Sequence, residues 1–142
     1  MLVRKQNWQV LLHEYLRGCR GREFHYGAFD CCLFVCDAIH AMTGVDVASP
    51  LREKYGSRKQ AFRAIAKYAG HPSVQAVTER VTADHGMPEI SPSLAQRGDV
   101  ALITRNYDFS LALVGLDGGI LAAGARGYER VPPLLAVRAW RV

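Results

Sequence analysis

The hydrophobic periodicity of this 142-residue chain changes from helical to β-like part-way along, and this change constrains the fold more than any other feature. Apolar residues recur at helical spacing up to about residue 85. From residue 97 onward the chain contains short apolar runs that are typical of strands. The stretch between them, residues 86–95, is rich in proline and serine, which predicts a linker loop. Helices first and an antiparallel sheet last predict an α+β fold.

Two helices are predicted in the first part of the chain. Apolar residues over 7–17 recur at the spacing of an amphipathic helix, which the glycines that follow should end. A second helix is expected over residues 31–42, with Asp30 as its N-cap and Gly44 after its last turn. We expect the first of these helices to cap the domain or to dock on a partner.

Two further helices and four strands are predicted after residue 56. Ser57 and Gln60 have the spacing of a capping box, which starts a third helix ending near Gly70. A short fourth helix is expected after Ser73. The predicted strands cover residues 100–104, 110–116, 120–123 and 136–142, and the sequence DGG at 117–119 predicts a tight hairpin between two of them.

The length of the chain is that of one domain, and no linker divides it further. We therefore predict a single domain over residues 1–142. It would comprise an N-terminal helix within 1–20, a helical part over 24–85 and an antiparallel sheet over 97–142.

The formal net charge is +5, which permits contact with nucleic acid or a bacterial envelope without identifying either. The densest basic run lies over residues 52–67, where few aromatic side chains are available to stack on bases. We interpret this run as a solvated helix face and expect no nucleic-acid partner.

The opening sequence MLVRKQNWQV contains no uninterrupted apolar run, and no stretch is apolar enough to span a bilayer. These features predict no signal peptide and no membrane span, hence a soluble protein made in a reducing cytoplasm. The four cysteines are accordingly expected to be free thiols.

Three of these cysteines lie within six positions at the start of the predicted second helix. Cys31 would meet the unpaired N–H groups and the positive end of the helix dipole, both of which favour thiolate. Helical spacing puts Cys31 on one face and Cys32 and Cys36 on another. Cys31 is therefore a candidate nucleophile, and all three thiols are alternatively small core side chains.

A third interpretation is that Cys32, Cys36 and His40, each four residues from the next, hold a metal ion. Such a site would need a fourth ligand from elsewhere, and the usual two-residue cysteine spacing is absent. We therefore expect no metal and no cofactor.

The sequence DCCLFV at 30–35 resembles the D-C-S-G-[LF]-V segment around the nucleophile of NlpC-type cell-wall peptidases. These small papain-like enzymes cut peptide bonds in peptidoglycan stems. Residues 97–103 resemble the first core strand of these enzymes, and residues 110–123 align without a gap on their H-V-[GA]-I hairpin. The resemblance implies a papain-like NlpC-type fold with Cys31 at the start of the core helix.

A subgroup of small NlpC-like proteins encoded among bacteriophage tail genes resembles the chain more closely. Its F-x-[WY]-G-x-x-D-C motif matches residues 24–31, and its A-W-R ending matches 139–141. Its T-G-x-D-x-A and R-x-x-Y motifs match residues 43–48 and 52–55. The resemblance therefore covers nearly the whole chain from residue 24 onward.

The chain departs from the enzymes at the positions that surround the nucleophile. Ser110 stands where they have the catalytic histidine, and a hydroxyl does not accept a proton from a thiol near neutral pH. Phe24 replaces a pocket tyrosine, and Ala122 replaces the third polar residue. His25, six residues before Cys31, is a candidate substitute base, while Asp30 beside the nucleophile is most simply the N-cap.

The resemblance thus implies a bacteriophage or prophage protein of the tail tip or hub, catalytically degenerate and structural or assembly-related. Its partners would be tail hub or tail-tip proteins, with peptidoglycan as a further candidate. It would be made in the bacterial host cytoplasm and located in the virion. The alternative is an active cysteine peptidase that cuts peptidoglycan stem peptides during genome entry, with Cys31 as nucleophile. A third hypothesis is an unrelated small cytoplasmic binding module.

Overall fold

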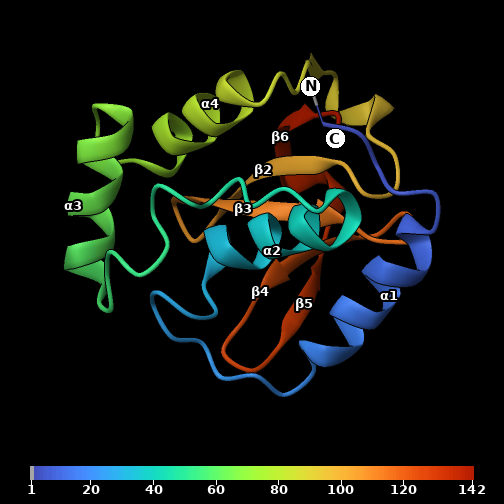
Figure 1. Ribbon diagram of the computed structural model, residues 1–142, viewed down its shortest axis with the longest axis horizontal. Helices are drawn as coiled ribbons and strands as arrows, with labels where there is room; N and C mark the ends of the chain where they lie inside the picture. The colour runs from blue at the N-terminus through green and yellow to red at the C-terminus, as the bar shows by residue number, and fades with distance from the viewer. Residues whose placement is uncertain (1) are drawn as a thin grey trace.

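Helices and strands occupy separate halves of the chain, as the change in periodicity predicts. The computed structural model describes residues 2–142, and this part contains four α-helices followed by a six-stranded antiparallel sheet. Figure 1 shows the helices arranged around the sheet, with the two chain ends side by side. The α+β prediction is confirmed.

The four helices are α1 (Trp8–Gly18), α2 (Cys31–Thr43), α3 (Arg58–Ala69) and α4 (Val74–Asp84). The side chains of Asp30, Ser57 and Ser73 accept the backbone N–H three residues further on and so cap α2, α3 and α4. Gly44 and Gly70 end α2 and α3 in the left-handed conformation that glycine adopts without strain. All four predicted helices are confirmed, because their start and stop signals are local.

The sheet has the strand order β1-β6-β2-β3-β4-β5, and every neighbouring pair is antiparallel. Its strands are β1 (Glu89–Ile90), β2 (Val100–Arg105), β3 (Asp108–Val114), β4 (Ile120–Ala123), β5 (Tyr128–Val131) and β6 (Ala136–Trp140). Two short 3₁₀ helices, η1 (Pro92–Leu94) and η2 (Pro133–Leu135), lie between strands. The four predicted strands are all present, and Gly115 and Gly119 close the predicted hairpin with a backbone hydrogen bond of 2.7 Å.

Two strands were not predicted, and both lie at the edges of the sheet. The expected linker over residues 86–95 contains β1, whose Glu89 and Ile90 pair with Trp140 and Ala139 of β6, and also η1. The linker prediction is therefore wrong in part. The other missed strand, β5, has two exposed charged residues between Tyr128 and Val131, so it lacks the alternation that identifies a strand. Pairing with a neighbour, rather than local pattern, makes both segments strands.

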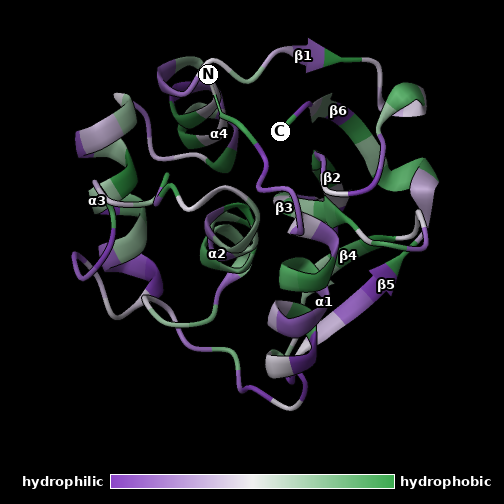
Figure 2. Cartoon of the chain, turned by 45° about the vertical axis from the view of Figure 1, so that its right-hand side comes forward, coloured by the Kyte–Doolittle hydropathy of each residue, from purple (hydrophilic) through white to green (hydrophobic). Residues whose placement is uncertain are grey.

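The main hydrophobic core lies between α2 and the sheet. In Figure 2, hydrophobic residues predominate on α2 and β4, whereas β5 is largely hydrophilic. The side chains of α2 are buried on several sides of the helix, including Phe34, Val35 and Ile39. A second, smaller cluster on the other face of the sheet is covered by Leu135 and Ala136. Burial of α2 on both flanks explains why its sequence is more apolar than that of the other helices.

The N-terminal segment ties the two chain ends together. The Arg4 guanidinium donates to Asp99 Oδ1 at 2.9 Å and to the carbonyl oxygens of Val142 and Arg97 at 3.1 and 2.8 Å. The helix α1 follows this segment and packs on α2, where the Tyr15 hydroxyl donates to the Phe34 carbonyl oxygen at 2.7 Å. The first helix therefore covers α2.

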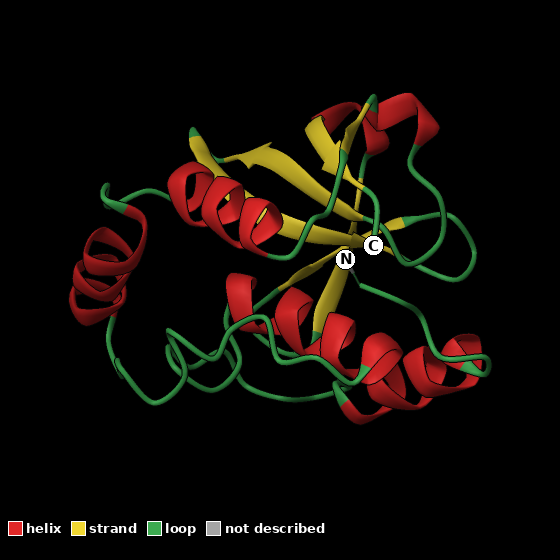
Figure 3. Cartoon of the chain, turned by 45° about the horizontal axis from the view of Figure 1, so that its top comes forward, coloured by secondary structure: helices red, strands yellow, loops and turns green. Residues whose placement is uncertain are grey.

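The helices of residues 2–142 are all too short or too polar to cross a bilayer. Among them, α3 packs mainly on α4. Figure 3 shows α3 set apart from the sheet.

Candidate functional site at the start of α2

Asp30 fixes the backbone at the start of α2. Its side chain is buried, and its Oδ1 accepts the N–H of Leu33 at 2.9 Å. Its Oδ2 accepts the N–H of Gly27 at 3.0 Å and the hydroxyl of Tyr55 at 2.7 Å. The predicted N-cap is confirmed, and three hydrogen bonds hold the carboxylate in place beside the next residue, Cys31.

Cys31 is the first residue of α2, and its half-buried thiol lines a cavity of about 100 Å³. Aromatic side chains make up much of the wall, namely Phe24, Tyr26, Tyr55, Phe62 and Phe109. The strand β3 and the start of α3 close the cavity on the side opposite α2. The thiol therefore faces a small, largely apolar space.

Several hydrogen-bond donors surround this thiol. The Cys32 Sγ lies 3.9 Å from the Cys31 Sγ, and the Leu111 backbone N–H and the Ser110 hydroxyl lie on the β3 side. The contact with the Cys32 thiol, followed by those with the Leu111 backbone and the Ser110 hydroxyl, lowers the pKa of Cys31, although burial and the negative charge of Asp30 act in the opposite direction. The arrangement therefore makes the Cys31 thiol more acidic than an ordinary cysteine thiol.

The other thiols lie in the core. Cys32 and Cys36 are buried in α2, and Cys19 is buried at the end of α1. The hydrogen bond to Cys31, together with burial, raises the pKa of Cys32 well above its ordinary value. Burial likewise raises the pKa values of Cys36 and Cys19. These three thiols pack as small apolar side chains and are protonated near neutral pH.

Ser110 lies on β3, where its backbone pairs with Ile103 of β2. Its half-buried hydroxyl donates to the Leu111 carbonyl oxygen at 3.2 Å. The Ser110 hydroxyl lies near the Cys31 thiol, whose pKa it lowers. Ala122, by contrast, is buried in the second cluster, while Phe24 lines the cavity and meets Tyr26 edge to face at 5.0 Å.

The structure does not bring His25 to Cys31. The His25 side chain is exposed, and its Nδ1 lies 2.9 Å from the carbonyl oxygen of Tyr26. The backbone of His25 pairs with Phe29 in the turn before α2, and its neighbours Phe24 and Tyr26 line the cavity while His25 does not. No histidine of residues 2–142 lines the cavity or hydrogen-bonds to Cys31. A thiolate here has hydrogen-bond donors without an imidazole.

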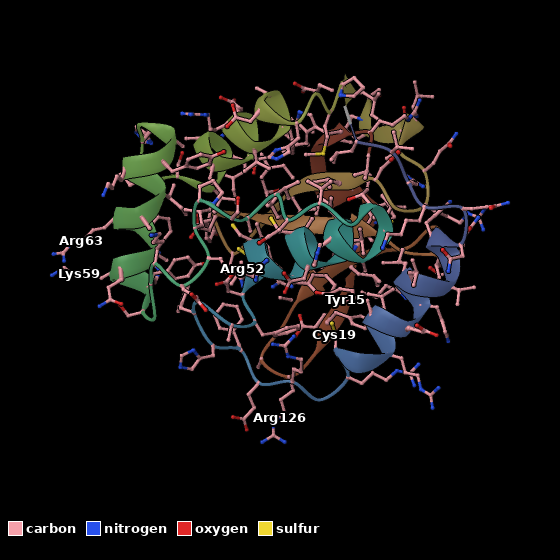
Figure 4. The ribbon with its side chains drawn as sticks, in the orientation of Figure 1. Tyr15, Cys19, Arg52, Lys59, Arg63 and Arg126 are labelled. Atoms are coloured by element: carbon pink, nitrogen blue, oxygen red, sulfur yellow. The ribbon has the colours of Figure 1, made fainter. Side chains whose placement is uncertain are left out.

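Tyr55 and Arg52 are functional-site residues whose roles could not be derived from local pattern. Tyr55 holds Asp30, and Arg52 donates to both Asp37 of α2 and Asp46 at 2.7 and 2.8 Å. Figure 4 shows Arg52 beside α2, close to its start. Both residues belong to the R-x-x-Y match at 52–55, which is the signal that could have identified them. These contacts hold the segment that contains Arg52 and Tyr55 against α2 and against Asp30 at its start.

An exposed ion pair spans the mouth of the cavity. Arg58, at the start of α3, lies 3.9 Å from Asp108, at the start of β3, and both residues line the cavity.

Within residues 2–142, no three His, Cys, Asp or Glu side chains are grouped so that they could hold a metal ion.

The comparison with known families decides where the chain belongs. Residues 3–142 match the family described as "Domain of unknown function (DUF6950)". The chain belongs to the DUF6950 family. A comparison with curated proteins finds no match. Since the family description names no activity, a function for this DUF6950 member must come from the geometry of its site.

Proposed function

We propose that this protein is a bacteriophage or prophage tail-tip or hub-associated protein with an NlpC-type, papain-like fold and a catalytic centre that has lost its base. The domain would then serve in tail structure or assembly. The observation that carries the proposal is that Ser110, rather than a histidine, lies beside the Cys31 thiol. In the alignment with NlpC-type peptidases, this is the position of the catalytic imidazole.

The arrangement of the elements supports an NlpC-type fold. A cysteine begins the buried helix α2, and α2 packs on β3 of an antiparallel sheet. The hairpin β3–β4 covers the residues that resemble the H-V-[GA]-I hairpin of the peptidases. Order along the chain and placement in space therefore agree with the resemblance.

The motifs of the phage-tail subgroup support the tail assignment. Residues from separate motifs contact one another, since Tyr55 binds Asp30 and Arg52 binds Asp46. These contacts tie residues 52–55 to the start of α2 and to the loop that follows it. They are the pattern expected of a scaffold whose structure is retained after its activity is lost.

Loss of the base explains why activity is not expected. An imidazole with a pKa near 6.5 accepts a proton from a thiol at neutral pH, whereas a serine hydroxyl does not. In a serine protease, removal of the base lowers kcat on the order of 10⁶-fold. A lowered pKa at Cys31 supplies some thiolate but no group that returns a proton to the leaving amine.

Muropeptide hydrolysis tests the catalytic half of the proposal. We expect the wild type to release no more product than Cys31→Ser, which lacks the thiol. Ser110→His restores an imidazole at the family position and serves as the gain-of-function arm. Cleavage by the wild type that disappears in Cys31→Ser would overturn the degenerate site in favour of an active peptidase.

Particle assembly tests the structural half. In a lysogen that carries the gene, we expect deletion to reduce assembled tails, and both the wild type and Cys31→Ser to restore them. The protein itself should be detected in purified tails or in their assembly intermediates. Restoration by the wild type but not by Cys31→Ser would show that the thiol, and not the scaffold, is required.

A further inference from the structure

A basic groove lies beside α3 and shares no residue with the Cys31 cavity. We define the α3 groove by three cationic side chains, Lys54, Arg63 and Lys67, and three apolar ones, Pro50, Ala64 and Tyr68. Its volume is about 610 Å³, several times that of the cavity at Cys31. The space is large enough to receive side chains from another molecule.

The three cations of the α3 groove pair with no carboxylate within residues 2–142, although Arg58 and Arg80 nearby pair with Asp108 and Asp84. The chain contains no Asp or Glu from residue 54 to residue 78. Within residues 2–142, Lys54, Arg63 and Lys67 form no ion pair, whereas arginines elsewhere, such as Arg52 and Arg138, are each paired with two carboxylates. The α3 groove is therefore an uncompensated positive surface.

The arrangement of charge on α3 opposes the stability of the helix itself. Lys59, Arg63 and Lys67 are each four residues from the next, so like charges face one another along one side of the helix. The first turn of α3 has no acidic residue to offset them. Figure 4 shows Lys59 and Arg63 extending from α3 away from the rest of the molecule. Repulsion of this kind is relieved when a negatively charged partner binds.

The aromatic residues near the groove do not offer faces for base stacking. The Arg80 guanidinium covers the Tyr68 ring at 4.8 Å, and the Arg58 guanidinium covers the Phe62 ring at 5.0 Å. Proteins that bind single-stranded nucleic acid use exposed aromatic faces for stacking. Cations that flank an apolar floor instead fit an amphipathic protein segment, whose carboxylates pair with the cations while its apolar side chains cover the floor.

We propose that the α3 groove is the docking site for an acidic, amphipathic segment of a partner protein. The inference names the chemistry of the partner that the proposed function requires, and to that extent it rests on the proposed function. It does not depend on the state of Cys31, because the two sites have no lining residue in common.

A labelled helical peptide of about 15 residues, with glutamates on one side and leucines on the other, tests the proposal by fluorescence anisotropy, since α3 has 12 residues. We expect binding that weakens as salt rises. The triple variant Lys54→Gln/Arg63→Gln/Lys67→Gln should bind about tenfold more weakly, and Cys31→Ser should bind as the wild type does.

The matched control removes three other exposed arginines that form no ion pair within residues 2–142, in the variant Arg17→Gln/Arg20→Gln/Arg126→Gln. This control changes the net charge equally and should retain binding within about twofold. Circular dichroism would verify that both variants are folded. If the two variants lost peptide binding equally, the loss would be due to net charge rather than to the α3 groove, and the proposal would be overturned.

Two further probes separate the partner classes. A peptide of the same composition with the glutamates and leucines scrambled should bind more weakly than the amphipathic one, and a glutamine-substituted peptide should not bind. Tighter binding of a duplex DNA of similar length would overturn the protein-segment proposal in favour of nucleic acid. Failure of every peptide would also overturn it while leaving the proposed tail function standing, because assembly is measured separately.

Discussion

The start of α2 and the exposed side of α3 differ in whether their polar groups have hydrogen-bond or ion-pair partners. At α2, the buried Asp30 carboxylate accepts three hydrogen bonds, and within residues 2–142 no buried side-chain nitrogen or oxygen lacks a partner. At α3, Lys59, Arg63 and Lys67 face solvent and form no ion pair within residues 2–142, although Arg58 lies 3.9 Å from Asp108. Burial makes an unpaired polar group costly, whereas water solvates an exposed charge at little cost. Unpaired charge is therefore found where it is available to a partner.

The difference predicts that loss of a buried ionic partner has the largest effect. Arg4→Ala should lower the free energy of unfolding by about 3 kcal/mol, because Asp99 remains buried without its closest cation. Urea unfolding would measure the change. Arg20→Ala, an exposed arginine outside any ion pair of residues 2–142, is the control and should change it by less than about 0.5 kcal/mol. Similar losses in the two variants would refute the contrast between buried and exposed charge.

The second prediction compares two adjacent thiols. Iodoacetamide should label Cys31 at least about 100-fold faster than Cys32 at neutral pH, which corresponds to about 2.8 kcal/mol. The reason is that the pKa of Cys31 is lowered and that of Cys32 is raised. Peptide mass spectrometry from pH 5 to pH 9 would give both profiles.

Ser110→Ala sharpens that comparison. Removal of the hydroxyl should move the Cys31 labelling profile to higher pH, since the nearby Ser110 hydroxyl lowers the pKa of Cys31. His25→Ala should leave the profile unchanged, because His25 does not line the cavity. A profile that moves in His25→Ala instead would mean that a histidine acts on the thiol in solution.

The third prediction compares the caps of the two helices. Asp30→Ala should lower the free energy of unfolding by about 2 kcal/mol, because it leaves the buried donor of Leu33 and the half-buried donors of Gly27 and Tyr55 without their acceptor. The matched change Ser57→Ala removes one exposed hydrogen bond at α3 and should cost about 0.5 kcal/mol. Thermal unfolding followed by circular dichroism would rank them. The reverse order would contradict the assignment of Asp30 as the buried anchor.

The smallest effect concerns a partly exposed ion pair. Hydrogen bonding from Arg52 lowers the pKa of Asp46, so ionised Asp46 stabilises the folded state. This contribution is fully present above the unfolded pKa of about 3.9 and is lost as pH falls through the lower folded pKa. Because both side chains are about one-third exposed, Arg52→Gln should cost only about 1 kcal/mol near pH 7. Unfolding measured at pH 7 and below pH 4 should show the difference shrink; a constant difference would exclude the linkage.

Much of the fold could be predicted from sequence because its signals are local. Asp30, Ser57 and Ser73 cap helices through atoms three residues away, and Gly44 and Gly70 end helices through their own backbone freedom. The position of Cys31 at a helix start follows from the same signals. Edge strands β1 and β5 carry no such signal, since β1 depends on pairing with the distant strand β6 and β5 on pairing with the preceding strand β4.

The site itself is mostly a product of tertiary structure. Local sequence determined that a cysteine begins α2 and that Asp30 caps it. Tertiary packing alone decided that Ser110 of β3 lies beside Cys31, that Tyr55 anchors Asp30 and that His25 turns outward. Contacts between residues far apart in the chain depend on how helices and sheet pack, because side-chain hydrogen bonds and ion pairs act only over a few ångströms. The same reason explains why the pairing of Arg4 with Asp99, 95 residues apart, could not be predicted from either residue.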